Sequence, residues 1–188
     1  MNNNIKIAMT EIICAGRQLA IWGLISASSG NISCRLTDKT ILITASGTNK
    51  GCLEKEDLLL IDLDGQIIKE YKAVKPSSEA ALHLALYKNF PQISAIIHAH
   101  PPFATKLATK GLEMPKNPFF SKPLPIVPPL PAGSPELAQA VLITVQTNLG
   151  AQALLLAAHG ALSWGESIDQ ALYRMEALEQ IAITTVGK

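Results

Sequence analysis

The 188-residue chain has few charges, few arginines and no long apolar run, and each shortage narrows its class. Charged residues make up 16% against 48% hydrophobic residues, so we expect part of the surface to be buried between subunits of a homo-oligomer. The net charge of +1 and the presence of only three arginines argue against a nucleic-acid partner. Since no apolar run reaches the length of a membrane span, we predict no membrane association.

The small number of cysteines indicates a cytoplasmic protein. Cys14, Cys34 and Cys52 are odd in number and scattered, which is typical of reduced thiols in small core positions. Residues 1–6 do not resemble a signal peptide. The length suits one domain, so we expect residues 1–188 to share a single core. Neither a Walker A motif nor Gly-x-Gly-x-x-Gly occurs, so nucleotide binding has no support.

Three of the four histidines stand at the ends of two apolar runs. His98 and His100 close Ile93-Ser-Ala-Ile-Ile-His-Ala-His, and His159 follows Ala153-Leu-Leu-Leu-Ala-Ala. Because residues i and i+2 of a strand point to one face, His98 and His100 would direct two imidazoles at one point. A third imidazole from a neighbouring strand end gives three nitrogen ligands and an open position, the layout of a catalytic zinc site. The alternative is that each histidine is an ordinary residue at the rim of the core.

The apolar periodicity predicts short strands among amphipathic helices. We expect helices over residues 5–24, 76–89, 103–109, 134–147 and from 167 towards the C-terminus, and strands over 32–36, 40–44, 58–62, 66–70, 93–100, 124–127, 153–158 and 161–164. Asp64-Gly65 is a strong hairpin signal between two of these strands. The explicit hairpins predict a mainly antiparallel sheet with helices on both faces.

Three loops of small polar residues share one chemistry. They are Ser29-Gly-Asn-Ile-Ser, Thr44-Ala-Ser-Gly-Thr and Lys75-Pro-Ser-Ser-Glu. Glycine lets backbone N–H groups approach a ligand closely, and a helix N-terminus, here predicted at Ser77 and Ser78, favours an anion. Together the loops could cradle a phosphate, although each one alone is better explained by ordinary turn and capping chemistry.

Glu79 lies beside these loops, in the first turn of the helix predicted to begin at Pro76. A carboxylate there could cap the helix, serve as a fourth metal ligand, or act as a general acid or base. His83 is one helical turn further on and could pack against Glu79 or hydrogen-bond to it. We expect His83 on the helix surface or behind the site, and not on the metal.

These segments, taken in order, make the chain resemble a known family. It resembles the class II, zinc-dependent sugar-phosphate aldolases of the L-fuculose-1-phosphate aldolase type, within the aldolase/epimerase superfamily. The matching pieces are Ser29-Gly-Asn-Ile-Ser, Ile43-Thr-Ala-Ser-Gly-Thr, Pro76-Ser-Ser-Glu, Ile97-His-Ala-His-Pro-Pro-Phe-Ala-Thr, Pro131-Ala-Gly-Ser-Pro-Glu-Leu and His159-Gly-Ala-Leu-Ser-Trp-Gly. The resemblance implies an α/β fold, a three-layer α/β/α sandwich with a central, mainly antiparallel sheet. It also implies a homotetramer with the active site near a subunit interface.

The resemblance also assigns roles. His98, His100 and His159 would bind Zn²⁺, and Glu79 would be the catalytic acid/base. The substrate phosphate would be bound by six residues: Gly30, Asn31, Ser46, Gly47, Ser77 and Ser78. The implied reaction is reversible aldol cleavage of a small sugar 1-phosphate to dihydroxyacetone phosphate and an aldehyde. The superfamily also holds sugar-phosphate dehydratases, decarboxylases and epimerases. An alternative of another class is a non-catalytic protein in which zinc only joins strands.

Two differences separate this chain from the fuculose type. Those aldolases use a tyrosine from the neighbouring subunit, in the segment after the histidine pair, whereas residues 114–120 contain none. They also carry a C-terminal tail that can close over the site, whereas this chain stops soon after its last predicted helix. We therefore expect Phe119 or Phe120 to line the aldehyde pocket.

Overall fold

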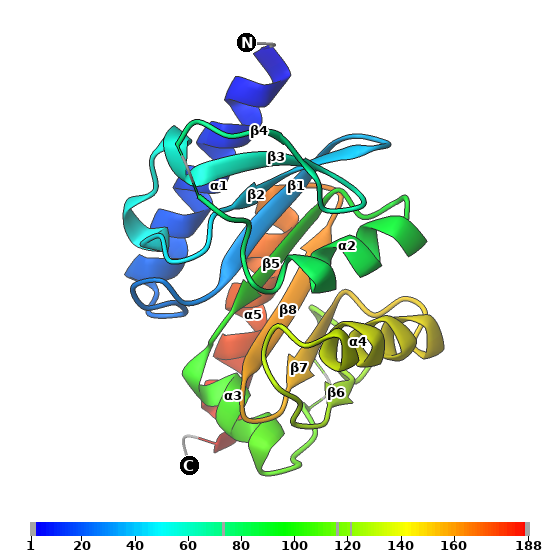
Figure 1. The fold of residues 1–188 in the computed structure, drawn as a ribbon. Coiled ribbons are helices and arrows are strands. Elements are labelled where there is room, and N and C mark those ends of the chain that lie inside the picture. Colours follow the sequence, from blue (N-terminus) through cyan, green and yellow to red (C-terminus); the bar gives the residue numbers. More distant parts are fainter. Residues whose placement is uncertain (1–2, 73, 116, 121, 187–188) are drawn as a thin grey trace.

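The fold is built on one central sheet (Figure 1). The structure, a computed structural model, describes residues 3–72, 74–115, 117–120 and 122–186. Its strands are β1 (Asn31–Thr37), β2 (Thr40–Thr44), β3 (Leu58–Asp62), β4 (Ile67–Lys69), β5 (Ala95–Ala99), β6 (Ile126–Val127), β7 (Ala153–Leu156) and β8 (Gly160–Gly165). Within those residues they form a single sheet in the order β4-β3-β2-β1-β5-β8-β7-β6. The predicted antiparallel pairing is confirmed except between β6 and β7, which run parallel.

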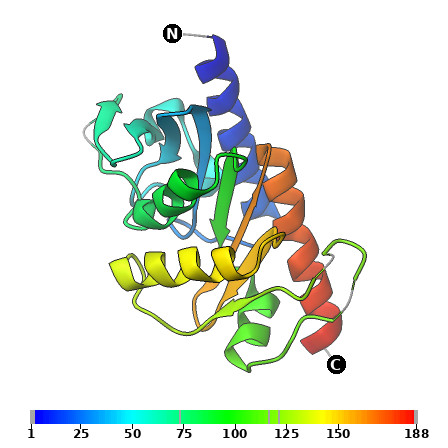
Figure 2. The same ribbon diagram turned by 90° about the vertical axis from the view of Figure 1, so that its right-hand side faces the viewer.

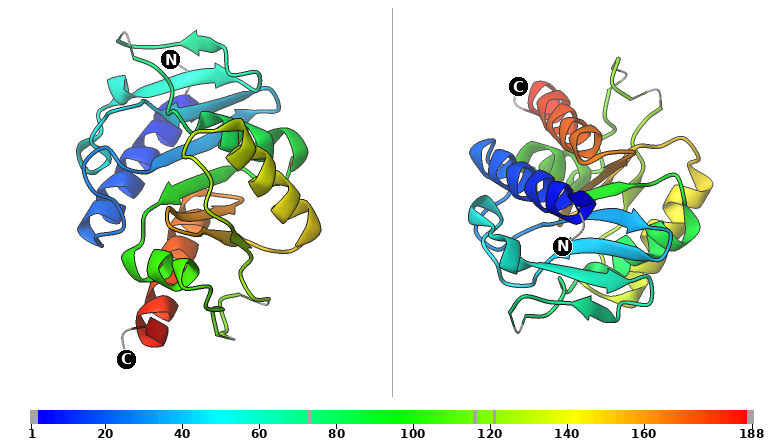
Figure 3. Two further views of the ribbon diagram at one scale, coloured as in Figure 1. Left: turned by 60° about the horizontal axis from the view of Figure 1, so that its bottom comes forward. Right: turned by 90° about the horizontal axis from the view of Figure 1, so that it is seen from above.

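Helices cover both faces of this sheet (Figures 2 and 3). They are α1 (Asn3–Ile21), α2 (Ala80–Asn89), α3 (Pro102–Thr109), α4 (Pro135–Thr147) and α5 (Ile168–Val186), with two 3₁₀ turns, η1 (Lys50–Cys52) and η2 (Lys55–Asp57). Helices α1, α3 and α5 lie on one face, and α2 and α4 on the other. The mixed α/β fold with a central, mostly antiparallel sheet is therefore confirmed. The two 3₁₀ turns lie between β2 and β3, where neither a helix nor a strand is predicted.

The two hydrophobic clusters of the core follow the alternation of side chains along the strands. In β5, Ile97 packs with the cluster under α1, α3 and α5, whereas Ile96 packs with the cluster under α2 and α4. The same alternation separates Leu155 from Leu154 in β7. His98 is two residues after Ile96, so its side chain emerges on the face that α2 covers. The pleat of β5 thus directs a buried imidazole towards the start of α2.

Helix α2 begins later than predicted. Pro76 forms an isolated bridge with Ala45, and the Ser77 N–H donates to the Thr44 oxygen at 3.3 Å. Residues 76–77 therefore extend alongside the end of β2 instead of entering the helix. The helix predicted from Pro76 is wrong in its first turn, and Glu79 is the N-cap of α2. Helix α1 likewise ends at Ile21, before the predicted Leu24.

The segment carrying His159 also differs from the prediction. Strand β7 ends at Leu156, and residues 157–159 form a turn into β8. The His159 N–H donates to the Leu156 oxygen at 3.1 Å, which closes this turn. His159 is therefore held by a tight connection between two paired strands, and not at the end of a strand that runs to residue 158.

The cysteines are free, but they are not all core residues. Cys34 is buried, whereas Cys14 and Cys52 are exposed, so the prediction of small core positions is correct for Cys34 alone. Among the described residues, no helix is both long and apolar enough to cross a bilayer. Two sequence predictions involve residues outside those that the structure describes. They are residues 1–2, within the segment 1–6 that does not resemble a signal peptide, and Lys116, within the segment 114–120.

Candidate functional site

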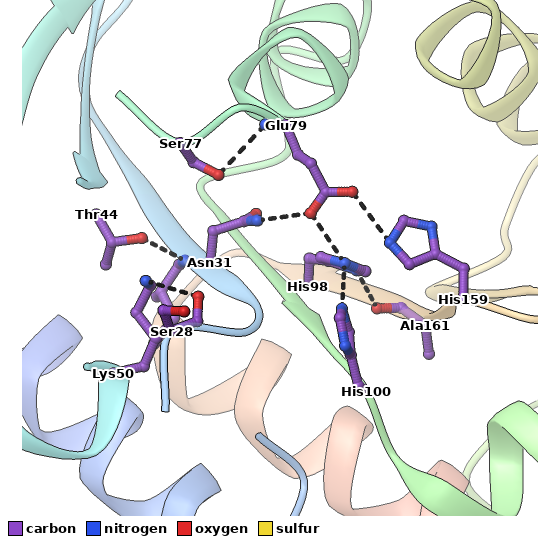
Figure 4. A network of polar contacts seen from close by, with 11 residues as sticks. Ser28, Asn31, Thr44, Lys50, Ser77, Glu79, His98, His100, His159 and Ala161 are labelled. Carbon is purple, nitrogen blue, oxygen red and sulfur yellow. Dashed lines mark hydrogen bonds and ion pairs between the residues drawn. The ribbon is translucent and has the colours of Figure 1, made fainter. Parts of the chain in front are cut away.

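Three imidazoles converge at one edge of the central strands (Figure 4). His98 lies in β5, His100 follows that strand, and His159 precedes β8, which pairs with β5 through Ala99 and Ala161. The Nε2 atoms of His98 and His100 are 3.0 Å apart, and the three ring centroids lie 4.8–5.4 Å from one another. One ligand atom from each ring lies within 4.8 Å of the other two. The predicted meeting of these three side chains is thus present in the fold.

A backbone contact fixes the orientation of His98. Its ring is fully buried, and Nδ1 lies 3.0 Å from the Ala161 oxygen. A carbonyl can only accept, so Nδ1 carries a proton, and Nε2 is the nitrogen that faces the other two rings and Glu79. Metal-binding histidines are commonly oriented by such a hydrogen bond on their second nitrogen.

The turn that carries His159 approaches β5 unusually closely. A Cβ atom on Gly160 would lie 2.4 Å from the Ala99 oxygen, so only glycine fits there. Ala158, just before His159, has a φ of 58°, a conformation that costs a residue with a side chain free energy. Its N–H donates to Thr109 Oγ1 at 2.9 Å, which ties the turn to the end of α3. The position of His159 therefore depends on contacts from two other elements.

Glu79 completes the cluster. Its Oε2 lies 3.1 Å from His98 Nε2, and its Oε1 lies 3.1 Å from His159 Nε2. The Asn31 amide donates to Oε2 at 3.0 Å. Although Glu79 is the N-cap residue of α2, its side chain makes no capping hydrogen bond, so helix capping does not explain it. Imidazole nitrogens with one carboxylate form a donor set that suits zinc and related divalent metals.

The electrostatics of the cluster also suit a cation. Burial acts to raise the pKa of Glu79, but hydrogen bonds from His159 and His98 outweigh it and hold that pKa well below its usual range. Burial lowers the pKa of His100 to about 4, and the neighbouring His98 and His159 act in the same direction. At neutral pH the site therefore presents an anionic carboxylate and a neutral His100 ring, the protonation states that bind metals.

His83 lies behind the cluster and not in it. It is fully buried, with Nδ1 2.7 Å from Ser33 Oγ, and that oxygen is 2.9 Å from the Tyr87 hydroxyl. Burial lowers the pKa of His83 to about 3, so the ring is neutral. Of the two places predicted for His83, the structure shows the one behind the site and not the helix surface, and the hydrogen-bond partner of the ring is Ser33 and not Glu79.

The three loops predicted to bind phosphate gather beside Glu79. Asn31 pairs with His98 across β1 and β5. The Ser46 N–H donates to the Lys75 oxygen at 2.9 Å, and Ser77 Oγ accepts from the Glu79 N–H at 3.3 Å. The fold therefore brings the segments near residues 30, 46 and 77 together beside the carboxylate, and Figure 4 shows Asn31 and Ser77 next to Glu79.

The glycines and Ser78 of these loops differ in how tightly they are held. Gly30 has a φ of 72°, and a Cβ on it would lie 2.7 Å from the His98 oxygen. Gly47 has a φ of 74° with open space around it. The Ser78 oxygen lies 3.0 Å from the position of a Cβ on Gly133, so that residue packs against the loop before α4. A phosphate-binding role for these residues remains a prediction.

One residue of this region was missed by the sequence analysis. Lys50 is 2% exposed, and its Nζ lies 2.7 Å from the Thr48 oxygen and 3.3 Å from the Ser28 oxygen. Burial lowers its pKa to about 8, against an opposing effect of Asp57. Lysine between Asn49 and Gly51 is typical of a surface turn, and no pattern in the sequence marks it as buried.

The two phenylalanines of the segment 114–120 have different surroundings. Phe120 is buried in the core cluster under α1, α3 and α5. Phe119 is 65% exposed and lines a surface cavity of about 630 Å³ together with Tyr173 and Arg174 of α5. None of the three clustered histidines is among the described residues that line this cavity. Of the two residues, only Phe119 is placed to contact another molecule.

Comparisons with known proteins show the family of the chain. A family model described as "Class II Aldolase and Adducin N-terminal domain" matches residues 10–186. The chain is 35% identical to methylthioribulose-1-phosphate dehydratase of Methylococcus capsulatus, over 91% of this chain and 89% of that protein. It is 32% identical to 3-oxo-tetronate 4-phosphate decarboxylase of Haemophilus influenzae, over 89% and 81%.

Structural comparison gives the third relative. The crystal structure of L-fuculose-1-phosphate aldolase from Thermus thermophilus superposes with a TM-score of 0.83 at 29% identity, covering 99% of this chain and 94% of that one. The three relatives carry three different reaction names, so the comparisons do not select one reaction. The Thermus thermophilus structure shares the fold of this chain, and the family-model match over residues 10–186 makes the chain a member of the class II aldolase family.

Proposed function

We propose that this protein is a zinc-dependent lyase that catalyses the reversible aldol cleavage of a small, fuculose-phosphate-like sugar 1-phosphate to dihydroxyacetone phosphate and an aldehyde. The observation that carries the proposal is the carboxylate of Glu79, which lies 3.1 Å from the Nε2 atoms of both His98 and His159. A base held beside three potential metal ligands suits removal of a proton next to a carbonyl group.

The ligands proposed for zinc are His98, His100 and His159. When bound, the metal would act as a Lewis acid that polarises the substrate carbonyl. Hydrogen bonding of His98 Nδ1 to the Ala161 oxygen holds that ring in the ligand orientation. A metal held by the three histidine nitrogens would have a position left for substrate, which argues against a purely structural metal.

Glu79 is proposed to move the proton. In the synthetic direction it takes a proton from the carbon beside the carbonyl of dihydroxyacetone phosphate, and in cleavage it returns that proton. Its carboxylate is ionised and so can accept a proton, and the Asn31 amide at 3.0 Å holds Oε2 in place. The phosphate would be bound by Gly30, Asn31, Ser46, Gly47, Ser77 and Ser78, which lie on the surface that ends at Glu79.

Dehydration of a sugar phosphate is the second candidate. It is favoured by the 35% identity to a dehydratase and by the absence of tyrosine from residues 114–120. Dehydration uses the same proton removal by Glu79 but needs no acid at the aldehyde oxygen. Introducing that acid through Phe119→Tyr should raise cleavage relative to proton exchange if the aldolase proposal is correct and the exposed Phe119 faces the site of a neighbouring subunit.

The test of proton transfer is Glu79→Gln. The variant should retain its metal and lose about 10²–10⁴-fold in the exchange of deuterium into dihydroxyacetone phosphate, the range expected for a general base. Glu113→Gln is the matched control, because Glu113 is exposed. Unchanged deuterium exchange in Glu79→Gln would show that Glu79 is not the general base.

Product analysis decides between the reactions. Fuculose 1-phosphate, methylthioribulose 1-phosphate and 3-oxo-tetronate 4-phosphate are each incubated with the metal-loaded enzyme. Aldol cleavage of fuculose 1-phosphate gives dihydroxyacetone phosphate and an aldehyde, and dehydration of methylthioribulose 1-phosphate leaves the carbon chain intact. Decarboxylation of 3-oxo-tetronate 4-phosphate releases carbon dioxide and also leaves dihydroxyacetone phosphate, so an aldehyde is the product that identifies aldol cleavage. If no substrate gives an aldehyde, the aldolase proposal is rejected.

We also propose that residues 1–188 form a single domain in a cytoplasmic homotetramer with the site near a subunit interface. The unpaired cysteines and the low fraction of charged residues support this assignment. Light scattering of the purified protein measures the number of subunits, and a monomer at micromolar concentration would contradict it.

A further inference from the structure

We infer that Lys50 is a positioning residue that joins the three loops around the substrate anion into one binding surface. This inference rests on the proposed function, since it concerns how the phosphorylated end of the substrate is bound. Lys50 is 2% exposed, and its ammonium group lies against the Ser28 oxygen (Figure 4). A lysine buried to this extent needs a reason, because taking an ammonium group out of water is costly.

The hydrogen bonds of Lys50 reach two of the loops directly. Its Nζ donates to the Ser28 oxygen at 3.3 Å, to the Ala45 oxygen at 3.4 Å and to the Thr48 oxygen at 2.7 Å. Its backbone N–H donates to the Ala27 oxygen at 3.0 Å. Ala27 has a φ of 47°, so the contact also holds a residue in an unfavourable backbone conformation. One residue thus closes the loop before β1 against the loop after β2.

The third loop is tied in through a single peptide. The Ala45 oxygen accepts from Lys50, while the N–H of the same peptide, on Ser46, donates to the Lys75 oxygen at 2.9 Å. Because C=O and N–H point in opposite directions in a trans peptide, fixing one fixes the other. Lys75 begins the segment that carries Ser77 and, next to the metal cluster, Glu79. Lys50 is therefore linked to the loop of the proposed base as well.

This arrangement has two consequences for an anionic ligand. The carbonyl oxygens of both loops are turned towards the ammonium group, so their negative ends face away from the surface where a phosphate would bind. The buried positive charge also lies in a region of low dielectric, where it attracts an anion more strongly than an exposed lysine does. Lys50 needs no direct contact with the phosphate to act in this way.

The test compares Lys50→Met and Lys50→Gln with the wild type. Inorganic phosphate binding to the zinc-loaded protein is measured by calorimetry, and it should weaken at least about tenfold in both variants. Lys55→Met is the matched control, because this substitution removes the same charge from a nearby side chain that is 64% exposed. Phosphate affinity unchanged in a folded Lys50 variant would overturn the inference.

A second readout separates this inference from the proposed reaction. Deuterium exchange is measured with dihydroxyacetone and with dihydroxyacetone phosphate. Lys50→Met should raise KM for dihydroxyacetone phosphate by a larger factor than KM for unphosphorylated dihydroxyacetone, whereas a general loss of structure would reduce exchange into both compounds by the same factor. Wild-type enzyme that binds phosphate but exchanges neither compound would reject the proposed function and leave the role of Lys50 standing.

A measurement on the wild-type protein covers the case in which the variants do not fold. In ¹⁵N-lysine-labelled protein, phosphate should shift the Nζ resonance of Lys50 and leave that of Lys55 in place. A Lys50 resonance that does not move at saturating phosphate would overturn the inference.

Discussion

The two halves of the site, on either side of Glu79, are built in different ways. On the proposed metal side, His98 is set by the pleat of β5, His100 directly follows that strand, and His159 is held by a turn next to the neighbouring strand β8. On the anion side, three irregular loops are joined by hydrogen bonds to and around Lys50. The metal side is rigid because paired strands support it, whereas the anion side depends on a buried side chain. Substitutions should therefore have different consequences on the two sides.

The largest effect is expected from His98→Ala. It removes a ligand and the main neutralising contact of Glu79 Oε2, so zinc affinity should fall by more than about a thousandfold, beyond the 10–100-fold typical of residues that only orient ligands. Metal content after dialysis measures this loss. Retention of stoichiometric zinc would show that the metal side is not centred on His98.

Glycine substitutions test the boundary between the halves. Gly30→Ala places a Cβ 2.7 Å from the His98 oxygen at a φ of 72°, and should destabilise the protein by about 2–5 kcal/mol through strain and overlap. Gly47→Ala meets open space and should cost only the backbone term of about 1–2 kcal/mol. Urea unfolding compares them. Equal losses of the free energy of unfolding would mean that the close approach of Gly30 to the His98 oxygen adds no cost.

The pH dependence of the free energy of unfolding should reveal the lowered pKa of Lys50. Burial lowers its pKa from 10.5 to about 8, so between these values the unfolded chain holds a proton that the folded chain has lost. The free energy of unfolding of the wild type, relative to Lys50→Met, should therefore rise as the pH increases through this interval, by up to about 3 kcal/mol. Unfolding of both proteins below and above the interval provides the measurement, and a constant difference would contradict the assignment.

The smallest effect is expected from Thr109→Val. The variant keeps the shape of the side chain but loses the oxygen that accepts from Ala158 at 2.9 Å. One such hydrogen bond contributes about 1 kcal/mol, so zinc affinity should fall less than about tenfold through a looser His159 turn. Calorimetric titration of the metal-free protein with zinc measures it. A loss as large as that of His98→Ala would mean that the metal side lacks the rigidity we assign to it.

Part of this site could be predicted from local pattern alone. The i, i+2 spacing of His98 and His100 forces both rings to one face of any strand, and Ser134 before Pro135 predicts the helix start that the structure confirms, where Ser134 Oγ accepts from the Leu137 N–H. The small residues of the three loops also indicate a surface open to backbone contacts. These features follow from geometry within a few residues, which the sequence determines by itself.

Tertiary structure decided the rest. The start of α2 moved to Ala80 because Pro76 pairs with Ala45, and this pairing places the Glu79 carboxylate on the histidines instead of on its own helix. Lys50 became buried because carbonyl oxygens of two loops surround it. Such contacts join residues that are far apart in the chain, and their free energy depends on the packed surroundings. The sequence therefore determined which groups are available, and packing determined which of them meet and in what state of charge.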